Sequence, residues 1–230
     1  MNDALIGNNI TTLLDRVRLA AQKSQHPTQD IRVVAASKTR PARDIRAAFE
    51  CGLRHFGENY LREALEKMPA LADLDLLWHF IGPIQSNKTR AISENFDWVH
   101  SVERIKIARR LSEQRPQRLP PLQICLQVNI SGEASKSGAT PGELPELVEA
   151  ISTLPQLQLR GLMAIPAPTS DWGKLAGDFE QLRALLAQLQ ALAPGMDTLS
   201  MGMSNDLELA IAHGSNLIRV GTDIFGPRSR

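Results

Sequence analysis

Short apolar runs alternate with amphipathic segments along most of the chain. Eight of these runs have the length and composition of buried strands, although the second and seventh are only weakly marked. The predicted strands are Ile31–Ala36, His55–Phe56, Leu76–Ile81, Trp98–Val102, Leu122–Val128, Leu159–Ala164, Thr198–Met201 and Asn216–Val220.

Helical spacing of apolar residues marks the segments between these strands. The first such pattern, at Ile10, Leu13, Leu14, Val17 and Ala21, predicts an opening helix that stops near Pro27. The other helix-like segments are Pro41–Cys51, Arg104–Glu113, Glu143–Thr153, Leu175–Leu192 and Asp206–His213.

Strands that alternate with helices pair in parallel through right-handed crossovers. An open doubly wound sheet and a closed eight-fold barrel both satisfy this pattern, and the count of eight favours the barrel. The expectation is therefore an α/β chain, residues 1–230, forming a single parallel (β/α)8 TIM-type barrel domain with an extra N-terminal helix. The polar stretch Ser131–Gly142 is interpreted as a long loop and not as a linker.

Composition narrows the classes of function. Twenty-six basic against 25 acidic residues give a net charge of +1, which argues against general nucleic-acid or anionic-membrane binding. Cys51 and Cys125 are far apart, so neither a disulfide framework nor a metal site is expected. Met1–Asp15 lacks the pattern of a signal peptide and no apolar run is long enough to span a bilayer, so we expect a cytoplasmic protein.

The loops after the seventh and eighth predicted strands carry groups suited to phosphate. Barrels of this kind place their sites at the C-terminal ends of the strands and often bind phosphate after these two. Ser204 lies where a helix begins, and Arg219, Gly221 and Thr222 supply a guanidinium, a close-approaching backbone and a hydroxyl. The alternative is that Ser204 is only a helix N-cap and Gly221 a turn glycine. Within a barrel, phosphate binding is favoured.

Lys38 follows the first predicted strand. A lysine after a strand is ordinarily solvated. In a closed barrel, however, the first strand neighbours the eighth, which would place Lys38 beside the predicted phosphate site. A neutral lysine amine in a partly desolvated pocket attacks carbonyls, so an aldehyde that bears a phosphate fits both features. Pyridoxal phosphate (PLP) is one such molecule, and the sugar-phosphate substrate of an aldolase is another.

Three other polar residues are open to two interpretations. His79 could lie inside the barrel as a site residue or be an ordinary hydrogen-bonded core histidine. Asn59 could bond a ligand oxygen or cap the following helix. Lys136, in a polar loop, is expected to be solvated, although a second amine near the rim could help to pass an aldehyde along.

Taken together, the motifs resemble one family. They are Ala36-Ser37-Lys38-Thr39, Phe56-Gly57-Glu58-Asn59, Trp78-His79-Phe80-Ile81-Gly82 with Gln85-Ser86-Asn87-Lys88, Gln127-Val128-Asn129-Ile130, Gly161-Leu162-Met163, Ser200-Met201-Gly202-Met203-Ser204-Asn205-Asp206, and Arg219-Val220-Gly221-Thr222 followed by Ile224-Phe225-Gly226. From about Ile31 to Arg228 the chain is similar to the pyridoxal-phosphate homeostasis family, whose barrel is similar to the N-terminal domain of alanine racemase.

The resemblance implies a role for each candidate residue. Lys38 would hold PLP as a Schiff base. Ser204, Gly221 and Thr222 would hold the phosphate, with Arg219 near the phosphate or the ring. It also implies that Asn59 and His79 line the pocket.

The same resemblance separates a carrier from an enzyme. Alanine racemase, as the resemblance suggests, uses a tyrosine from an additional domain that this sequence lacks, and the single tyrosine here is Tyr60. The expectation is therefore a non-catalytic, monomeric protein that buffers PLP and delivers it to apo-forms of PLP-dependent enzymes. The alternatives are a weak PLP-dependent racemase or related enzyme and, less well matched by the motifs, a cofactor-free Schiff-base aldolase.

Overall fold

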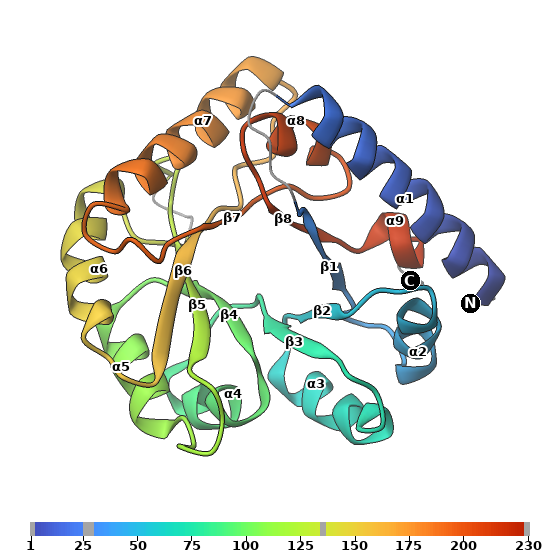
Figure 1. Ribbon diagram of the computed structural model, residues 1–230, viewed down its shortest axis with the longest axis horizontal. Helices are drawn as coiled ribbons and strands as arrows, with labels where there is room; N and C mark the ends of the chain where they lie inside the picture. Colours follow the sequence, from blue (N-terminus) through green and yellow to red (C-terminus); the bar gives the residue numbers. More distant parts are fainter. Residues whose placement is uncertain (1–2, 25–29, 134–136, 228–230) are drawn as a thin grey trace.

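Eight parallel strands close into a barrel in the order β1 to β8, with β8 paired back onto β1 (Figure 1). The computed structural model describes residues 3–24, 30–133 and 137–227. The strands are β1 Arg32–Ala36, β2 His55–Glu58, β3 Leu77–Phe80, β4 Trp98–Val102, β5 Leu122–Gln127, β6 Leu157–Met163, β7 Thr198–Ser200 and β8 Leu217–Val220. The predicted parallel (β/α)8 barrel is confirmed, including its two weakly marked strands.

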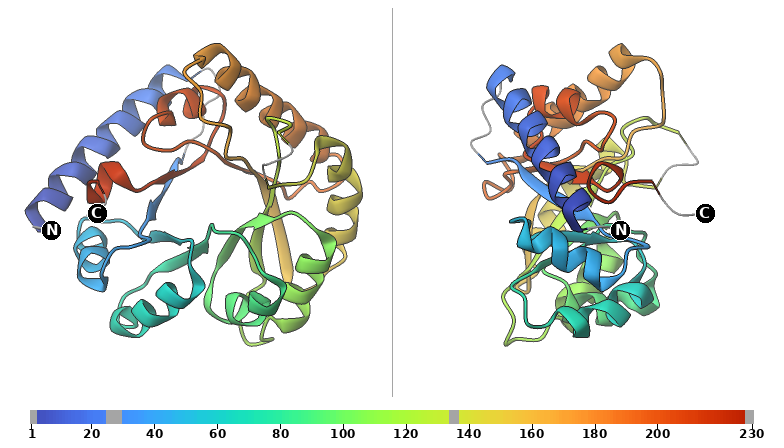
Figure 2. Two further views of the ribbon diagram at one scale, coloured as in Figure 1. Left: turned by 180° about the vertical axis from the view of Figure 1, so that it is seen from behind. Right: turned by 90° about the vertical axis from the view of Figure 1, so that its right-hand side faces the viewer.

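Helices surround the barrel on its outside (Figures 1 and 2). The α-helices are α1 Asp3–Lys23, α2 Ala42–Glu50, α3 Leu61–Lys67, α4 Thr89–Asn95, α5 Ile105–Gln114, α6 Leu144–Ser152, α7 Trp172–Leu189, α8 Leu207–Ala212 and α9 Thr222–Phe225; the short 3-10 turns are η1 Met68–Leu71, η2 Ser86–Lys88 and η3 Pro141–Glu143. None of the helices in the described ranges is both long enough and apolar enough to cross a bilayer.

The strands are apolar because the barrel buries both of their faces. All five residues of β4 are buried, and Val33, Val34 and Ala35 of β1 are buried as well. Parallel strands covered by helices on one side and by a packed interior on the other lose the polar alternation of half-exposed strands. Polar side chains inside such strands are therefore exceptional; among them, His79, His100 and Ser200 are fully buried.

The extra N-terminal helix is confirmed as α1. One face of α1 is buried through Ile6, Ile10, Leu13, Val17 and Ala20, which recur at helical spacing. This face packs against α2, α8 and α9, so α1 closes the outer layer over the first and last strands (Figure 1). The helix ends at Lys23, and the predicted stop near Pro27 lies outside the described residues.

The start of α8 corrects one expectation. Ser204 is not the N-cap, because the helix begins at Leu207 and its N-cap is Asp206. The Asp206 carboxylate instead accepts a hydrogen bond from the Met203 backbone N–H at 2.5 Å, which folds the intervening residues into a turn. Ser204 and Asn205 lie on this turn and not in the helix, so their polar groups are not used by a helical cap.

Candidate functional site

A cavity of about 930 Å3 opens at the C-terminal ends of the strands. Lys38 after β1, Ser204 after β7, and Arg219, Gly221 and Thr222 at the end of β8 all line it. The barrel closure brings these five predicted residues together, because β1 and β8 are hydrogen-bonded neighbours with Ala35 opposite Val220.

The residues on both sides of Lys38 are fixed to the next strand and helix. The Ser37 backbone N–H donates to the Gly57 carbonyl at 2.9 Å, and its hydroxyl donates to Glu58 Oε1 at 2.6 Å. Thr39 has a left-handed backbone (φ 65°), and its N–H donates to Glu63 Oε1 at 2.5 Å. This unusual conformation for a β-branched residue gives the chain a sharp bend directly after Lys38.

A buried ion-pair network holds the residues on both sides of this bend. The Nζ of Lys67 donates to Glu58 Oε1 at 2.6 Å, Glu63 Oε1 at 2.8 Å and the Ser37 carbonyl at 3.0 Å. Burial raises the pKa of Glu58, while Lys67 and the Ser37 hydroxyl act in the opposite direction. Sequence reasoning missed Lys67, although Glu63 and Lys67 stand four residues apart on one helix, a spacing that places their side chains together.

The two loops beside Lys38 present polar hydrogens to the cavity. Within the described ranges, the backbone N–H groups of Ser204 and Asn205 have no acceptor. The Ser204 Oγ accepts from the Asp223 N–H at 3.4 Å, which leaves its own hydrogen for another acceptor. A Cβ on Gly221 would meet the Ala36 carbonyl oxygen at 3.2 Å, so glycine keeps β8 close to β1 here. Loops with unused N–H groups of this kind favour an anion.

Arg219 brings a buried positive charge to the same cavity. It is 5% exposed, and its Nη1 donates to the Ser200 carbonyl at 2.6 Å while its Nη2 donates to the Ala164 carbonyl at 2.9 Å. No carboxylate among the described residues lies within ion-pair distance of its guanidinium. Burial lowers the pKa of Arg219 to about 10, so it stays charged at neutral pH. Its charge is therefore available to an anion in the cavity.

A row of hydrogen-bonded side chains runs from Arg219 through the barrel interior. Arg219 Nη1 lies 2.7 Å from Ser200 Oγ, which lies 2.8 Å from His100 Nδ1. His100 Nε2 is 2.8 Å from His79 Nδ1, and His79 Nε2 is 2.9 Å from His55 Nδ1. The histidine nitrogens meet in pairs and do not converge on one point. The described residues contain no cluster of ligands able to hold a metal ion.

Donor and acceptor chemistry fixes the tautomers of this row. A guanidinium can only donate, so Ser200 Oγ accepts from Arg219 and directs its own hydrogen to His100 Nδ1. His100 then carries its hydrogen on Nε2 and donates to His79, which in turn donates to His55. In the reverse order the buried Ser200 hydroxyl would have no acceptor among the described residues. All three imidazoles are therefore assigned as neutral Nε2–H tautomers.

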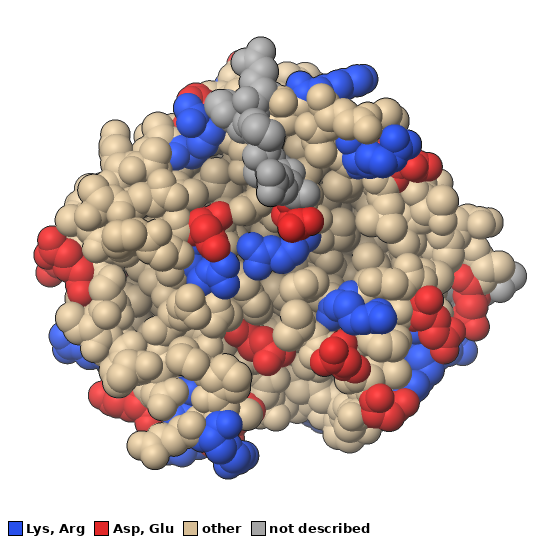
Figure 3. All heavy atoms as spheres, in the orientation of Figure 1, with Lys and Arg blue, Asp and Glu red and all other residues tan. Residues whose placement is uncertain are grey.

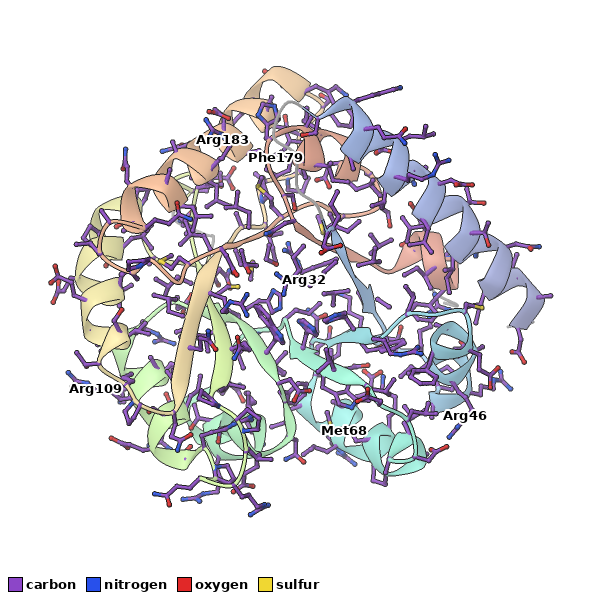
Figure 4. The ribbon with its side chains drawn as sticks, viewed as in Figure 1. Arg32, Arg46, Met68, Arg109, Phe179 and Arg183 are labelled. Carbon is purple, nitrogen blue, oxygen red and sulfur yellow. The ribbon has the colours of Figure 1, made fainter. Side chains whose placement is uncertain are left out.

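The environment of the row keeps these imidazoles neutral. Burial is the main cause that lowers the pKa values of His79 and His100 well below the usual range, and it lowers the pKa of His55 to about 4. Arg32, at the start of β1, adds a smaller effect in the same direction. Its side chain lies near the middle of the barrel in Figure 4, and its guanidinium stands 5.1 Å from the centre of the Trp98 ring. In the same orientation, Figure 3 shows basic and acidic side chains next to one another near the middle of the molecule.

Two predicted residues, His79 and Asn59, lie outside the cavity lining. His79 does not line the cavity, because Ser200 and His100 stand between it and Arg219. Asn59 also lies outside the cavity lining, and its buried Oδ1 has no hydrogen-bond partner among the described residues. Lys136 lies outside the described residues. The position of His79 within its strand could not reveal this depth, because Ser200 and His100 separate His79 from the lining residue Arg219 only in the folded barrel.

Comparison with known proteins identifies the family. Residues 9–229 match the family described as alanine racemase, N-terminal domain. The pyridoxal phosphate homeostasis protein of Pseudomonas aeruginosa is 58% identical over 223 residues, which cover 97% of this chain and 96% of that protein. Its counterpart in Escherichia coli strain K12 is 47% identical and covers 99% of this chain and 98% of its own. The chain belongs to the pyridoxal phosphate homeostasis protein family.

A solved family structure has the same fold. PipY of Synechococcus elongatus PCC7942, solved with PLP bound, is 37% identical, with a TM-score of 0.84 over 96% of this chain and 100% of that chain. The resemblance inferred from the motifs is thus confirmed. In this chain, the closed barrel places Lys38 and the loops after β7 and β8 around a single cavity.

Proposed function

We propose that this protein binds PLP in the cavity beside Lys38 and takes part in intracellular PLP homeostasis by buffering the cofactor and delivering it. One observation carries the proposal: the amine-bearing residue Lys38 shares a single cavity with the anion-binding groups of Ser204, Gly221, Thr222 and Arg219. A phosphorylated aldehyde needs both. The names of the relatives and the PLP-bound PipY structure support the same ligand.

Each end of PLP has a suitable partner in this cavity. The phosphate would accept hydrogen bonds from the Ser204 and Asn205 N–H groups, which have no acceptor among the described residues, and from the Ser204 and Thr222 hydroxyls. Arg219 would supply positive charge for the phosphate or the ring. Lys38 would join its Nζ to the aldehyde carbon as a Schiff base, with one water released. Asn59 and His79 would not contact PLP directly. Asn59 would affect the shape of the loop after β2, and His79 would affect the orientation of Arg219 through His100 and Ser200.

The cavity favours a carrier over an enzyme. Racemisation and related reactions need a second acid–base group across the substrate carbon. Among the described lining residues, Asp206 is the one carboxylate, and it accepts a hydrogen bond from the Met203 N–H at 2.5 Å. Tyr60 is 56% exposed and lies outside the lining. We therefore propose a non-catalytic, monomeric cytoplasmic barrel, residues 1–230, whose partners are PLP and apo-forms of PLP-dependent enzymes.

The test is to trap the bound aldehyde. Purified protein is mixed with PLP, reduced with borohydride and digested, and the modified lysine is located by mass spectrometry. We expect a new absorption band before reduction and a pyridoxyl group on Lys38 afterwards. The variant Lys38→Ala should lose both. Lys106, exposed on α5 and outside the cavity lining, is the matched control, and Lys106→Ala should behave as the wild type.

Delivery and catalysis are tested on the loaded protein. Transfer to an apo-transaminase should proceed faster than from an equal concentration of free PLP in the presence of a PLP scavenger. A wild type that gains no band with PLP would overturn cofactor binding. Racemisation of amino acids at about 1 s⁻¹ or faster, within the usual range of enzymes, would instead establish the racemase alternative.

A further inference from the structure

Arg16 on the outer helix α1 contacts both loops that carry the candidate phosphate groups. Its Nε and Nη2 donate to the two carboxylate oxygens of Glu208 at 2.7 and 3.0 Å. Its Nη2 also donates to the Ser204 carbonyl at 3.1 Å, and its Nη1 donates to Asp223 Oδ2 at 2.5 Å. All three guanidinium nitrogens are therefore engaged. Figure 1 shows α1 lying along α8 and α9, where these partners are.

The three partners belong to different segments around the cavity. Ser204 lies on the β7–α8 turn, Glu208 in the first turn of α8, and Asp223 in the first turn of α9. Ser204 is held on two sides, because its carbonyl accepts from Arg16 while its Oγ accepts from the Asp223 N–H at 3.4 Å. The remaining hydrogens of Ser204, on its backbone nitrogen and its hydroxyl, are left for the cavity that it lines.

We propose that Arg16 is a positioning residue for phosphate binding. It sets the distance between the Ser204 turn and the Thr222 turn, and in this way it determines how well the two loops together bind a phosphate monoester. Arg16 does not touch the ligand. The inference rests on the proposed function of the Lys38 cavity and assigns α1 a part in that function beyond packing.

Arg46 on α2 provides a close control. It donates to both carboxylate oxygens of Asp73 at 2.7 and 2.8 Å and to the Ala70 carbonyl at 3.0 Å. Its side chain is 37% exposed, against 34% for Arg16. Exposed pairs of this type contribute little to the stability of a fold. Loss of either arginine should therefore have a similarly small effect on stability, while only Arg16 contacts the cavity loops.

A second contact keeps the fold intact without Arg16. Asn9 Nδ2 donates to the Ile224 carbonyl at 3.0 Å, so α1 stays attached to α9. The apolar face of α1, with Ile10 and Leu13 fully buried, is also unaffected by a change at Arg16. The variant Arg16→Gln should consequently fold, and its thermal midpoint should match that of Arg46→Gln.

The experiment compares PLP with pyridoxal, which lacks the phosphate. In Arg16→Gln the Kd for PLP should rise about tenfold, the lower end of the range seen when the outer hydrogen-bond partners of binding groups in metal sites are removed. The Kd for pyridoxal should change less than about twofold, and Arg46→Gln should change neither. If the Kd values for PLP and pyridoxal rise equally in Arg16→Gln, Arg16 has only a general structural role and the proposal is overturned. An unchanged Kd for PLP would overturn it as well.

A titration with inorganic phosphate separates this inference from the proposed function. Backbone amide resonances of Ser204 and Thr222 in the wild type should shift on phosphate addition, and in Arg16→Gln the shifts should need about tenfold more phosphate. A wild type that binds inorganic phosphate at these amides but not PLP would overturn the proposed function alone. If the amide resonances of Ser204 and Thr222 in the wild type do not shift on phosphate addition, the proposed role of Arg16 is overturned.

Discussion

The Nη1 of Arg219 lies 2.7 Å from the Oγ of Ser200, and this hydrogen bond joins the cavity to the histidine row inside the barrel. Because Arg219 can only donate and His100 Nδ1 is the remaining partner of the Ser200 hydroxyl among the described residues, every hydrogen bond from Ser200 to His55 takes one direction. Arg219 in turn is held without a carboxylate partner among the described residues, so its charge is free to act on a ligand. Side chains in the barrel interior thus orient Arg219, which lines the cavity.

Replacement of Ser200 by alanine tests this connection. Ser200→Ala removes the hydroxyl between Arg219 and His100 and leaves the buried His100 Nδ1 without a donor. We expect the free energy of unfolding to fall by about 1–3 kcal/mol, the cost of an unsatisfied buried polar group. Urea denaturation measures this change. Ser152→Ala, at an exposed position on α6, should stay within about 0.5 kcal/mol of the wild type.

The tautomers in the row are a separate prediction. In 15N spectra of the wild type, His79 and His100 should each show a protonated Nε2 and an unprotonated Nδ1. In Ser200→Ala the constraint on His100 is lost, so a mixture of tautomers should replace the single form. A protonated Nδ1 on His100 in the wild type would contradict the assignment.

The buried histidines predict a dependence of stability on pH. Folding lowers their pKa values, for His55 to about 4, whereas in the unfolded chain they take up protons near the ordinary value of about 6.5. The unfolded state therefore binds more protons below pH 6.5, and stability falls as pH falls from about 6.5 toward 4. Each histidine adds up to about 1.4 kcal/mol per pH unit to this fall.

Urea denaturation at several pH values measures this effect, and NMR titration assigns it. The ring resonances of His79 and His100 should not titrate while the protein remains folded. Titration of either ring near pH 6 in the folded protein would refute the assigned neutral row.

The ion pair below Lys38 predicts a large effect of one substitution. Lys67→Met leaves Glu58, which is fully buried, without its main compensating charge. We expect a loss of about 3–5 kcal/mol at pH 7, as for other broken buried pairs. Because the variant should raise the pKa of Glu58 further, protonation should reduce the loss at pH 5. The double variant Glu58→Gln with Lys67→Met should recover much of the stability; an equally unstable double variant would contradict this account.

A glycine in the β7–α8 connection tests how closely this connection is packed. Gly202 has φ 95°, and an added Cβ would meet the Ala210 Cβ at 2.7 Å. Gly202→Ala should therefore destabilise the fold by about 1–3 kcal/mol and displace the Ser204 turn. Gly177, exposed on α7 with open space at the Cβ position, is the control: Gly177→Ala should stabilise the fold by about 0.5–1 kcal/mol. Thermal unfolding of both variants gives the comparison, and equal midpoints would contradict the expected difference.

Much of the barrel was predictable because buried parallel strands leave a strong pattern in the sequence. The apolar runs gave eight strands, and the motifs around Lys38 and after Ser200 gave the family. The pattern was weakest for β2 and β7, because β2 reads His-Phe-Gly-Glu with a single large apolar residue and β7 has only three residues. The segment Asp206–His213 was predicted correctly as the α8 helix, but Ser204 was taken as its possible N-cap because Asp206 and Ser204 are both good capping residues two positions apart.

The sequence by itself determined the barrel, its outer helix and the residues that meet at the rim, because strand periodicity and chain order decide which C-terminal ends face the same way. It could not determine the depth of a side chain or its partners. Tertiary structure alone placed His79 below the cavity, joined it to His55 and His100, and brought Arg16 from the first helix to Ser204 near the end of the chain. These contacts join residues up to 188 positions apart, and long-range hydrogen bonds depend on three-dimensional closure, which leaves no local pattern.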